Sequence, residues 1–238
     1  MLHGKSTMDL RRAEFSYEQF TLGPVNWSVK EGSRSALVGP NGAGKTTLLN
    51  LLGGQASPTR GSIHVSGHDV ASEAIAVREI VGLVAERLLC CPWMTAIEHF
   101  ELQGDFFPAW NPTLARHLAT ELRLDMSVKL GQLSRGTSLK VSLCCALAQG
   151  AKVLLLDEPT AGLDPVARAE FLRLLSELLI DRGDISVVFA THILEDLDEL
   201  RPTEILLLNA GRATLHPIAI NATTRASEMA KSALLSCQ

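Results

Sequence analysis

The stretch SALVGPNGAGKTTLLNLL, residues 35–52, places a lysine and two threonines directly after closely spaced glycines. It matches the pattern G-x-x-x-x-G-K-[ST], and the apolar residues on both sides predict a strand before the loop and a helix after it. The glycines let backbone N–H groups point at phosphate oxygens, and the helix adds the positive end of its dipole. We therefore expect a nucleotide site, although a glycine-rich turn that happens to carry a lysine would have the same composition.

The polar side chains of this loop have expected partners. Lys45 is expected to neutralise the β- and γ-phosphates, and the Thr46 hydroxyl to bind Mg²⁺. The expected nucleotide-binding residues are Gly39, Pro40, Asn41, Gly42, Ala43, Gly44, Lys45, Thr46 and Thr47.

The run VLLLDEP, residues 153–159, supplies the acidic groups that such a loop needs. Asp157 ends the apolar run and is expected in the Mg²⁺ shell, whereas Glu158 extends past the strand end, where an attacking water would lie. The two carboxylates are therefore expected to have different roles. The alternative is that they cap the following helix, because acidic residues favour the first helical turn.

The segment LSRGTSLK, residues 133–140, has two interpretations. Ser134 can cap an ordinary helix through its hydroxyl. The same hydroxyl, with the bare N–H of Gly136, can also form half of a phosphate site at a helix N-terminus.

Strand and helix signals alternate along most of the chain, which predicts a parallel sheet flanked by helices. In the first third, short strand-like runs broken by glycine and charged residues predict an antiparallel β layer. Residues 86–150 are mostly helical in pattern, and later apolar runs predict strands buried on both faces. The expected class is α/β: a P-loop core with a parallel sheet, an N-terminal antiparallel β layer and an inserted α-helical subdomain.

Composition restricts the possible partners and the compartment. The 238 residues are 46% hydrophobic, carry a net charge of −4 and have a pI near 6.0, so no nucleic-acid partner is expected. The five cysteines lack the C-x-x-C spacing of metal and redox sites. No apolar run approaches the roughly 18 residues of a membrane span, and MLHGKSTMDLRR at residues 1–12 lacks the apolar stretch of a secretory signal, so we expect a soluble cytoplasmic protein.

Four motifs, GPNGAGKTTLL, LSRGT, LLLDEPTAGLDP and ATH, occur in this order and together resemble the nucleotide-binding domain of an ABC transporter. The resemblance covers about residues 10–215. It implies a P-loop NTPase domain at 1–215, with its helical subdomain at about 86–150, and an ATP hydrolase that uses ATP and Mg²⁺. Residues 216–238 form a C-terminal tail, as a short docked helix or a frayed end.

In that family, two ATPase domains clamp two ATP molecules, and each P-loop is completed by the partner's signature segment, commonly LSGGQ. The resemblance implies that Ser134, Arg135, Gly136 and Thr137 contact ATP bound to the second domain. Arg135 replaces the first glycine and Thr137 the glutamine, which implies a variant site. A capping role for Ser134 is compatible, because both functions use the same helix end.

Three further positions match the family pattern. His192 resembles the switch histidine that contacts the γ-phosphate and orients the water. Asp164 resembles the loop that links the two sites of the dimer, or it caps a helix that starts at Pro165. Tyr17 resembles the aromatic residue that stacks on adenine, or it packs on an edge strand.

Glu86 lies where the family usually has glutamine, and a carboxylate there can still bind Mg²⁺. The implied metal set is Thr46, Glu86 and Asp157. This loop normally couples the nucleotide to a permease. The aromatic residues that follow it either line a groove for a short permease helix or pack inside the helical subdomain; they are Trp93, Phe100, Phe106, Phe107 and Trp110.

The resulting hypothesis is an ATP-hydrolysing motor subunit of an exporter, held at the inner face of the cell membrane by a separate integral membrane permease. A homodimer with two competent sites is the simplest assembly. Two alternatives stay open: a soluble ATPase of this family that acts on nucleic acid or ribosomes, and a regulator that closes on ATP but hydrolyses little of it.

Overall fold

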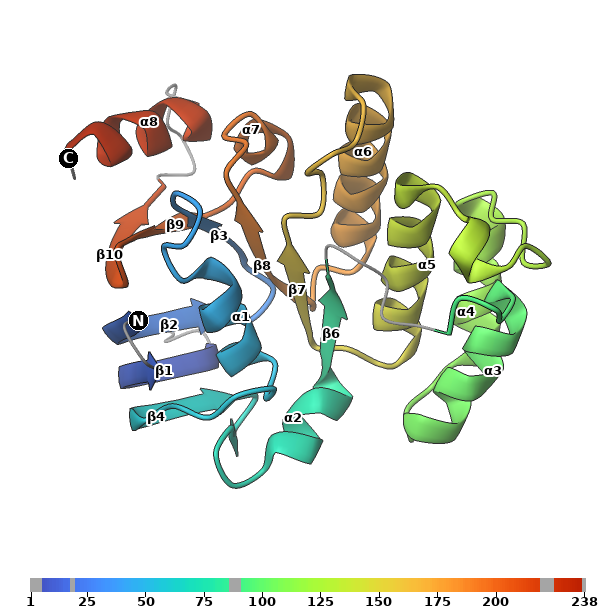
Figure 1. Ribbon diagram of the computed structural model, residues 1–238, viewed down its shortest axis with the longest axis horizontal. Coiled ribbons are helices and arrows are strands. Elements are labelled where there is room, and N and C mark those ends of the chain that lie inside the picture. The colour runs from blue at the N-terminus through green and yellow to red at the C-terminus, as the bar shows by residue number, and fades with distance from the viewer. Residues whose placement is uncertain (1–5, 18–19, 86–90, 219–224, 237–238) are drawn as a thin grey trace.

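The computed structural model describes residues 6–17, 20–85, 91–218 and 225–236. Two sheets and a group of helices form the molecule (Figure 1). In chain order the elements are β1 (Ser6–Tyr17), β2 (Phe20–Lys30), β3 (Arg34–Val38), α1 (Lys45–Leu52), β4 (Arg60–Val65), β5 (His68–Asp69), α2 (Ala74–Ile80), β6 (Val81–Val84), α3 (Ala96–Phe106), α4 (Pro112–Glu121), η1 (Leu130–Gln132), α5 (Arg135–Ala148), β7 (Val153–Asp157), α6 (Pro165–Asp181), β8 (Ser186–Thr191), α7 (Asp196–Leu200), β9 (Glu204–Asn209), β10 (Arg212–Pro217) and α8 (Ala226–Ser236).

The larger sheet has the strand order β10-β9-β3-β8-β7-β6. Its strands are parallel except β10, which forms an antiparallel hairpin with β9. Alternate residues of each strand enter different clusters: Leu154 and Leu156 pack with α5 and α6, whereas Val153 and Leu155 pack with α1. Both faces are therefore covered, which explains why these strands read as continuous apolar runs.

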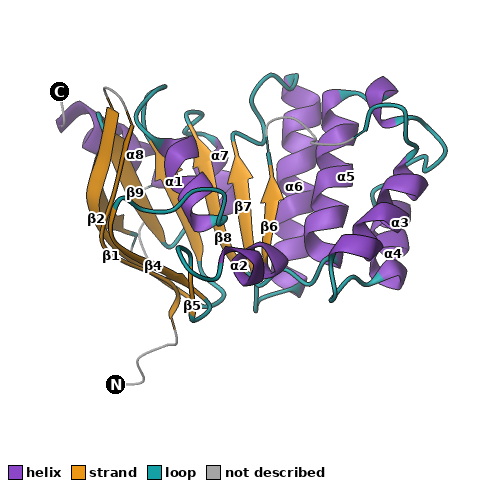
Figure 2. Ribbon diagram, turned by 60° about the horizontal axis from the view of Figure 1, so that its bottom comes forward, coloured by secondary structure: helices purple, strands orange, loops and turns teal. Residues whose placement is uncertain are grey.

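The smaller sheet, β2-β1-β4-β5, is antiparallel and shares a core with α1. At the other end of the molecule, α3 and α4 lie beside α5 (Figures 1 and 2). The expected α/β class, with a parallel core, an antiparallel layer and a helical segment, is confirmed. The sequence pattern did not reveal α2 or β6. The seven residues of α2 are too few for a clear helical period, and the four residues of β6 are too few for a clear strand pattern.

The C-terminal residues 226–236 form a docked helix, so of the two alternatives for this tail the docked helix is correct for the described part. Ser227 anchors α8 to α7, because its hydroxyl donates to Asp198 Oδ2 at 2.7 Å and its N–H to Oδ1 at 3.1 Å. Ala230 of α8 is fully buried in the same core as α5 and α6. Among the described residues, no helix is both long and apolar enough to cross a bilayer.

Glu204 links the two sheets. Its Oε1 accepts from Trp27 Nε1 at 2.9 Å and from Ser35 Oγ at 2.7 Å, and both of these donors belong to buried residues. One carboxylate therefore satisfies a donor from the antiparallel layer and a donor from the parallel core.

We expect Glu204→Leu to lower the free energy of unfolding by about 2–3 kcal/mol, because it leaves the Trp27 and Ser35 donors without an acceptor. Urea unfolding followed by circular dichroism measures this change. Glu177→Leu is the matched control, since Glu177 forms an exposed ion pair with Arg173 on α6, and we expect it to cost less than about 0.5 kcal/mol. Equal losses in the two variants would contradict the linking role.

Candidate functional site

The loop between β3 and α1 wraps around a buried lysine. Gly42 and Gly44 have φ of 79° and 106°, the left-handed region that glycine adopts without a steric penalty. Lys45 is 6% exposed, and its Nζ donates to the carbonyls of Gly39 at 2.9 Å and Pro40 at 3.3 Å. The loop thus forms as the motif predicts, with an ammonium held at its centre.

An open cavity of about 380 Å³ lies over this loop. No atom comes within 4 Å of a Cβ built on Gly42, and Thr46 is exposed. The first turn of α1 has no side-chain cap and no acidic residue, so its N–H groups are available to an anion. The residues therefore fit a nucleotide phosphate with a divalent cation. The cavity is lined by Tyr17, Phe20, Asn41, Gly42, Gly44, Lys45, Thr46, Thr47 and Glu158.

Glu158 contacts two other predicted site residues, Lys45 and His192. Its Oε1 is 3.3 Å from Lys45 Nζ, and its Oε2 is 2.7 Å from His192 Nδ1 and accepts from the His192 N–H at 3.2 Å. Its own N–H donates to Ala190 O at 3.0 Å, which continues the pairing of β7 with β8. Lys45, Glu158 and His192, which are far apart in the sequence, are therefore brought together.

The backbone of Glu158 is in a conformation that non-glycine residues rarely adopt, with φ of 48°. Such a conformation costs about 1–3 kcal/mol and persists only where the surroundings impose it. Here it turns the side chain toward Lys45 and His192.

Asp157 ends β7, one residue before Glu158, and pairs with Ala190 across the sheet. It therefore lies at the same sheet edge as the end of β3, from which the glycine-rich loop starts. This position agrees with a place in a Mg²⁺ shell. Glu86, the other predicted carboxylate ligand, lies outside the described residues.

The segment LSRGT forms the start of α5, with Ser134 as the N-cap. Ser134 Oγ accepts from the Thr137 N–H at 3.2 Å and lies 2.8 Å from Thr137 Oγ1. The nearest heavy atom to a Cβ built on Gly136 is 3.9 Å away, in Leu163, so this part of the helix end is uncrowded. The capping interpretation is confirmed, and the phosphate-binding role stays a prediction.

In one chain this segment does not reach the glycine-rich loop. The residues of α5 pack on one face of the larger sheet and those of α1 on the other. Among the described residues that line the cavity over loop 39–47, none comes from 134–137. Contact of this segment with a nucleotide on a second ATPase domain therefore stays a prediction.

Arg135 lies against the loop that follows Glu158. A Cβ built on Gly162, whose φ is 73°, would be 3.5 Å from Arg135 Nη1. The arginine that replaces a glycine of the signature therefore lies beside a second glycine-bearing segment. No sequence pattern revealed this contact, because it depends on packing between residues 27 positions apart.

Asp164 caps α6, since its Oδ1 accepts from the N–H groups of Val166 at 3.0 Å and Ala167 at 3.1 Å, with Pro165 at the first helical position. The helix-cap alternative is confirmed. Its role in linking two sites stays a prediction.

Tyr17 ends β1 with 54% of its surface exposed. Its ring centroid is 5.7 Å from that of Phe20 and 5.8 Å from that of Phe15, and it lines the cavity over the loop. The pairing of β1 with β4 ends at Glu14, so Tyr17 lies on a part of β1 that pairs with β2 alone. Adenine stacking and edge packing both stay predictions for Tyr17.

The aromatic residues between positions 93 and 110 do not act as one surface. Phe100 and Trp110 pack edge-to-face inside the helical region, with ring centroids 5.9 Å apart. Trp93 and Phe106 are each 69% exposed, and Phe107 lines the groove between α2, β6, α3 and α5. Core packing therefore accounts for Phe100 and Trp110, and a groove for a permease helix stays a prediction for the other three.

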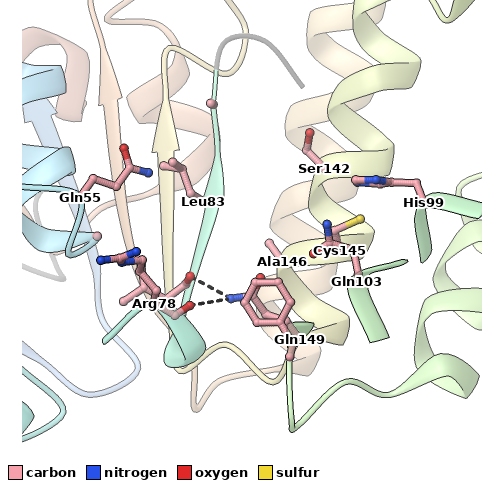
Figure 3. A pocket seen from close by; sticks show the side chains of 13 residues that line it. Gln55, Arg78, Leu83, His99, Gln103, Ser142, Cys145, Ala146 and Gln149 are labelled. Carbon is pink, nitrogen blue, oxygen red and sulfur yellow. Dashed lines mark hydrogen bonds between the residues drawn. The ribbon is translucent and has the colours of Figure 1, made fainter. Parts of the chain in front are cut away.

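A groove of about 240 Å³ does lie where α2 and β6 meet α3 and α5 (Figure 3). Its lining is mixed: Gln149 spans it by donating to Val81 O at 2.9 Å, and Arg78 donates to Gly54 O at 3.1 Å. His99 is 3% exposed, its Nδ1 has no hydrogen-bond partner among the described residues, and burial lowers its pKa. The polar members are Gln55, Arg78, His99, Gln103, Ser142 and Gln149.

Comparison with known families gives a match to the ABC transporter model over residues 22–161. The Nod factor export ATP-binding protein I of Burkholderia orbicola (strain AU 1054) is 36% identical over 200 residues, which cover 81% of this chain and 65% of that protein. The daunorubicin resistance ATP-binding protein DrrA3 of Streptomyces coeruleorubidus is 37% identical over 197 residues, which cover 80% and 61%. The chain thus spans less than two thirds of the length of these relatives.

Solved structures show the same architecture. An ATP-binding subunit of an ABC transporter matches with a TM-score of 0.78 at 25% identity, over 90% of each chain. A dimeric ATP-binding cassette in a post-hydrolysis state with ADP and Pi matches with a TM-score of 0.76 at 26% identity, over 89% of this chain and 99% of that one.

The burial of His99 predicts a pH-dependent stability. Its folded pKa is below the ordinary value of about 6.5, so the unfolded chain binds this proton more readily. The stability that comes from keeping His99 neutral in the folded protein is fully present above about pH 6.5. As the pH falls below this value, the free energy of unfolding decreases by at most about 1.4 kcal/mol per pH unit. We expect His99→Gln to remove this loss, so that the stability difference from wild type shifts in favour of the variant under acid.

Urea unfolding at about pH 8 and about pH 5.5 measures the effect. His117→Gln is the control, because it removes an imidazole that is exposed on α4. A stability difference between His99→Gln and wild type that is the same at both pH values would contradict the prediction.

Proposed function

Because the chain belongs to the ABC transporter family, we propose that it is an ATP-binding and ATP-hydrolysing motor subunit that energises a separate membrane permease. The observation that carries the proposal is the convergence of Lys45, Glu158 and His192 beside an open phosphate-sized cavity. A carboxylate held between two basic groups, on a residue with a strained backbone, is typical of a functional site and not of a structural loop.

In this proposal the loop 39–47 binds the phosphates of ATP through its N–H groups and Lys45. The groups available to Mg²⁺ are the Thr46 hydroxyl and the Asp157 carboxylate, with Glu86 as a further proposed ligand. When bound, the cation neutralises the charge that develops on the phosphate oxygens. Tyr17 is proposed to stack on the base, since its half-exposed ring lines the same cavity.

Glu158 is the proposed general base for the attacking water, with His192 orienting it. The Glu158 carboxylate contacts Lys45 at 3.3 Å and His192 at 2.7 Å. A bound γ-phosphate would compete with Glu158 for the Lys45 ammonium, and the carboxylate would then be available to accept a proton from water. The Glu158–His192 contact keeps the carboxylate oriented during this exchange.

The proposed assembly is a dimer with two composite sites. Support comes from the start of α5, where Ser134 and Gly136 form an accessible helix end that lies away from the loop of its own chain. In a second copy this end would complete the phosphate site, with Arg135 adding a positive charge and Thr137 a hydroxyl. Asp164, at the start of α6, is proposed to lie at the dimer interface.

The permease is proposed to dock in the groove beside His99. The groove is open, it is lined by residues of α2, α3, α5 and β6, and its one ionic side chain among the described lining residues is Arg78. A short permease helix with an acidic or amide residue would fit this lining. Docking would place the chain at the inner face of the cell membrane, and its similarity to a Nod factor export ATP-binding protein favours export.

Two alternative functions can be distinguished from that of a motor subunit. A soluble ATPase that acts on nucleic acid is disfavoured by the net charge of −4. A regulator that closes on ATP without turnover would share every binding residue and differ only in rate. A permease gene beside this one would favour the motor function over the first alternative, and steady-state hydrolysis decides the second.

We expect the solution mass of Glu158→Gln to double when ATP and Mg²⁺ are added, because ATP binding closes the dimer while the weakened base leaves ATP intact. We expect hydrolysis by this variant to be at least about 100-fold slower than by wild type. Light scattering and a phosphate-release assay measure the two quantities.

Lys45→Met is the control, because it removes the phosphate-binding ammonium and should stay monomeric with ATP. Hydrolysis by wild type without any change of mass in Glu158→Gln would contradict the composite sites. Closure of wild type on ATP without turnover would favour the regulator.

A further inference from the structure

Asp196, the first residue of α7, carries a buried carboxylate that the proposed function does not use. It is 1% exposed and does not line the cavity over loop 39–47. Its charge is balanced by Arg168 of α6, whose Nε and Nη2 both lie 2.7 Å from Asp196 Oδ1. A buried ion pair of this kind is costly to desolvate, so a well-packed apolar pair could replace it if stability were its only purpose.

The other carboxylate oxygen connects two loops. Thr160 Oγ1 donates a hydrogen bond to Asp196 Oδ2. The Thr191 hydroxyl lies 3.4 Å from the same oxygen and 3.3 Å from the Ile193 carbonyl oxygen. Both threonines are 1% exposed, so the Thr160 hydroxyl depends on Asp196 as its acceptor, whereas Thr191 shares its proton between two acceptors.

These threonines flank the two candidate catalytic residues. Thr160 lies two residues after Glu158, and Thr191 immediately precedes His192. The Glu158–His192 contact of 2.7 Å joins the same two loops on the solvent side. The two loops are therefore tied twice, once at the site and once in the protein interior.

The interior tie also accounts for the strained conformation. Glu158 keeps a φ of 48° only if the chain on both sides of it is held. Its N–H is fixed by Ala190 O before the turn, and Thr160 is fixed by Asp196 after it. We propose that Asp196 is a positioning residue that holds the loops of Glu158 and His192 in register for hydrolysis, an inference that rests on the proposed ATPase function.

Thr160→Val tests this directly, because it removes one hydroxyl with little change of shape and leaves the Arg168–Asp196 pair in place. We expect kcat for ATP hydrolysis to fall about tenfold while KM for ATP changes less than about twofold, since the loop 39–47 is untouched and only the catalytic groups are misplaced. Thr160→Ser keeps the hydroxyl and is expected to restore kcat to within about twofold of wild type.

Thr7→Val is the matched control. Thr7 is a buried threonine whose hydroxyl accepts from Ser186 Oγ at 2.9 Å, at the opposite end of β8 from Thr191. Thr7→Val removes a buried hydroxyl far from the site. We therefore expect it to lower the melting temperature as Thr160→Val does, but to leave kcat within about twofold of wild type.

A second measurement does not depend on turnover. The imidazole ¹⁵N resonances of His192, assigned by their loss in His192→Ala, report its contact with Glu158. We expect them to shift or broaden in Thr160→Val and to stay in place in Thr7→Val.

The inference is overturned if Thr160→Val matches wild type in kcat and in the His192 resonances, or if Thr7→Val loses kcat equally. If wild type hydrolyses no ATP, the proposed function fails, and the His192 resonances alone decide whether Asp196 holds the two loops.

Discussion

The hydrogen-bonded register of three neighbouring parallel strands, β3, β8 and β7, determines where every candidate catalytic group lies. Val38 pairs with Thr191, and Ala190 pairs with Asp157, so the three strands end together. The segments that leave them carry Lys45, Glu158 and His192. Because parallel strands run in the same direction, their carboxyl ends lie at one edge of the sheet. The loops that leave these ends come together there, and ligand sites form at this edge.

This edge and the sheet faces follow different physical rules. The faces are covered by apolar clusters in which nearly every side chain is Val, Leu, Ile, Phe or Ala. At the edge, buried Lys45 and Asp196 are each satisfied by carbonyls, hydroxyls or an opposite charge, and Glu158 adopts a strained φ. Glu158 is one of six described non-glycine residues with a positive φ, and the buried charges of Lys45 and Asp196 lie near it. The apolar faces supply the free energy that sustains the strain and the buried charges.

Local signals were sufficient for much of the fold. The glycine-rich loop, the apolar runs of β7 and β8, and the caps at Ser134 and Asp164 each depend on residues within a few positions of one another. Such patterns reflect backbone geometry directly, because a cap or a tight turn needs particular residue types at fixed offsets. The short elements α2 and β6 lacked this property, since their pattern is too brief to distinguish helix from strand.

The residue pattern was sufficient to predict the α/β class, the glycine-rich loop between a strand and a helix, the two carboxylates at a strand end and the capped start of α5. Only the packing of the folded chain shows that Glu158 meets both Lys45 and His192. It also shows that Arg135 lies against Gly162, that the aromatic residues divide between core and surface, and that Asp196 ties two loops. The reason is physical. Caps and turns are interactions between near neighbours in the chain, whereas these contacts join residues up to 113 positions apart, as for Lys45 and Glu158, and depend on how sheets and helices pack.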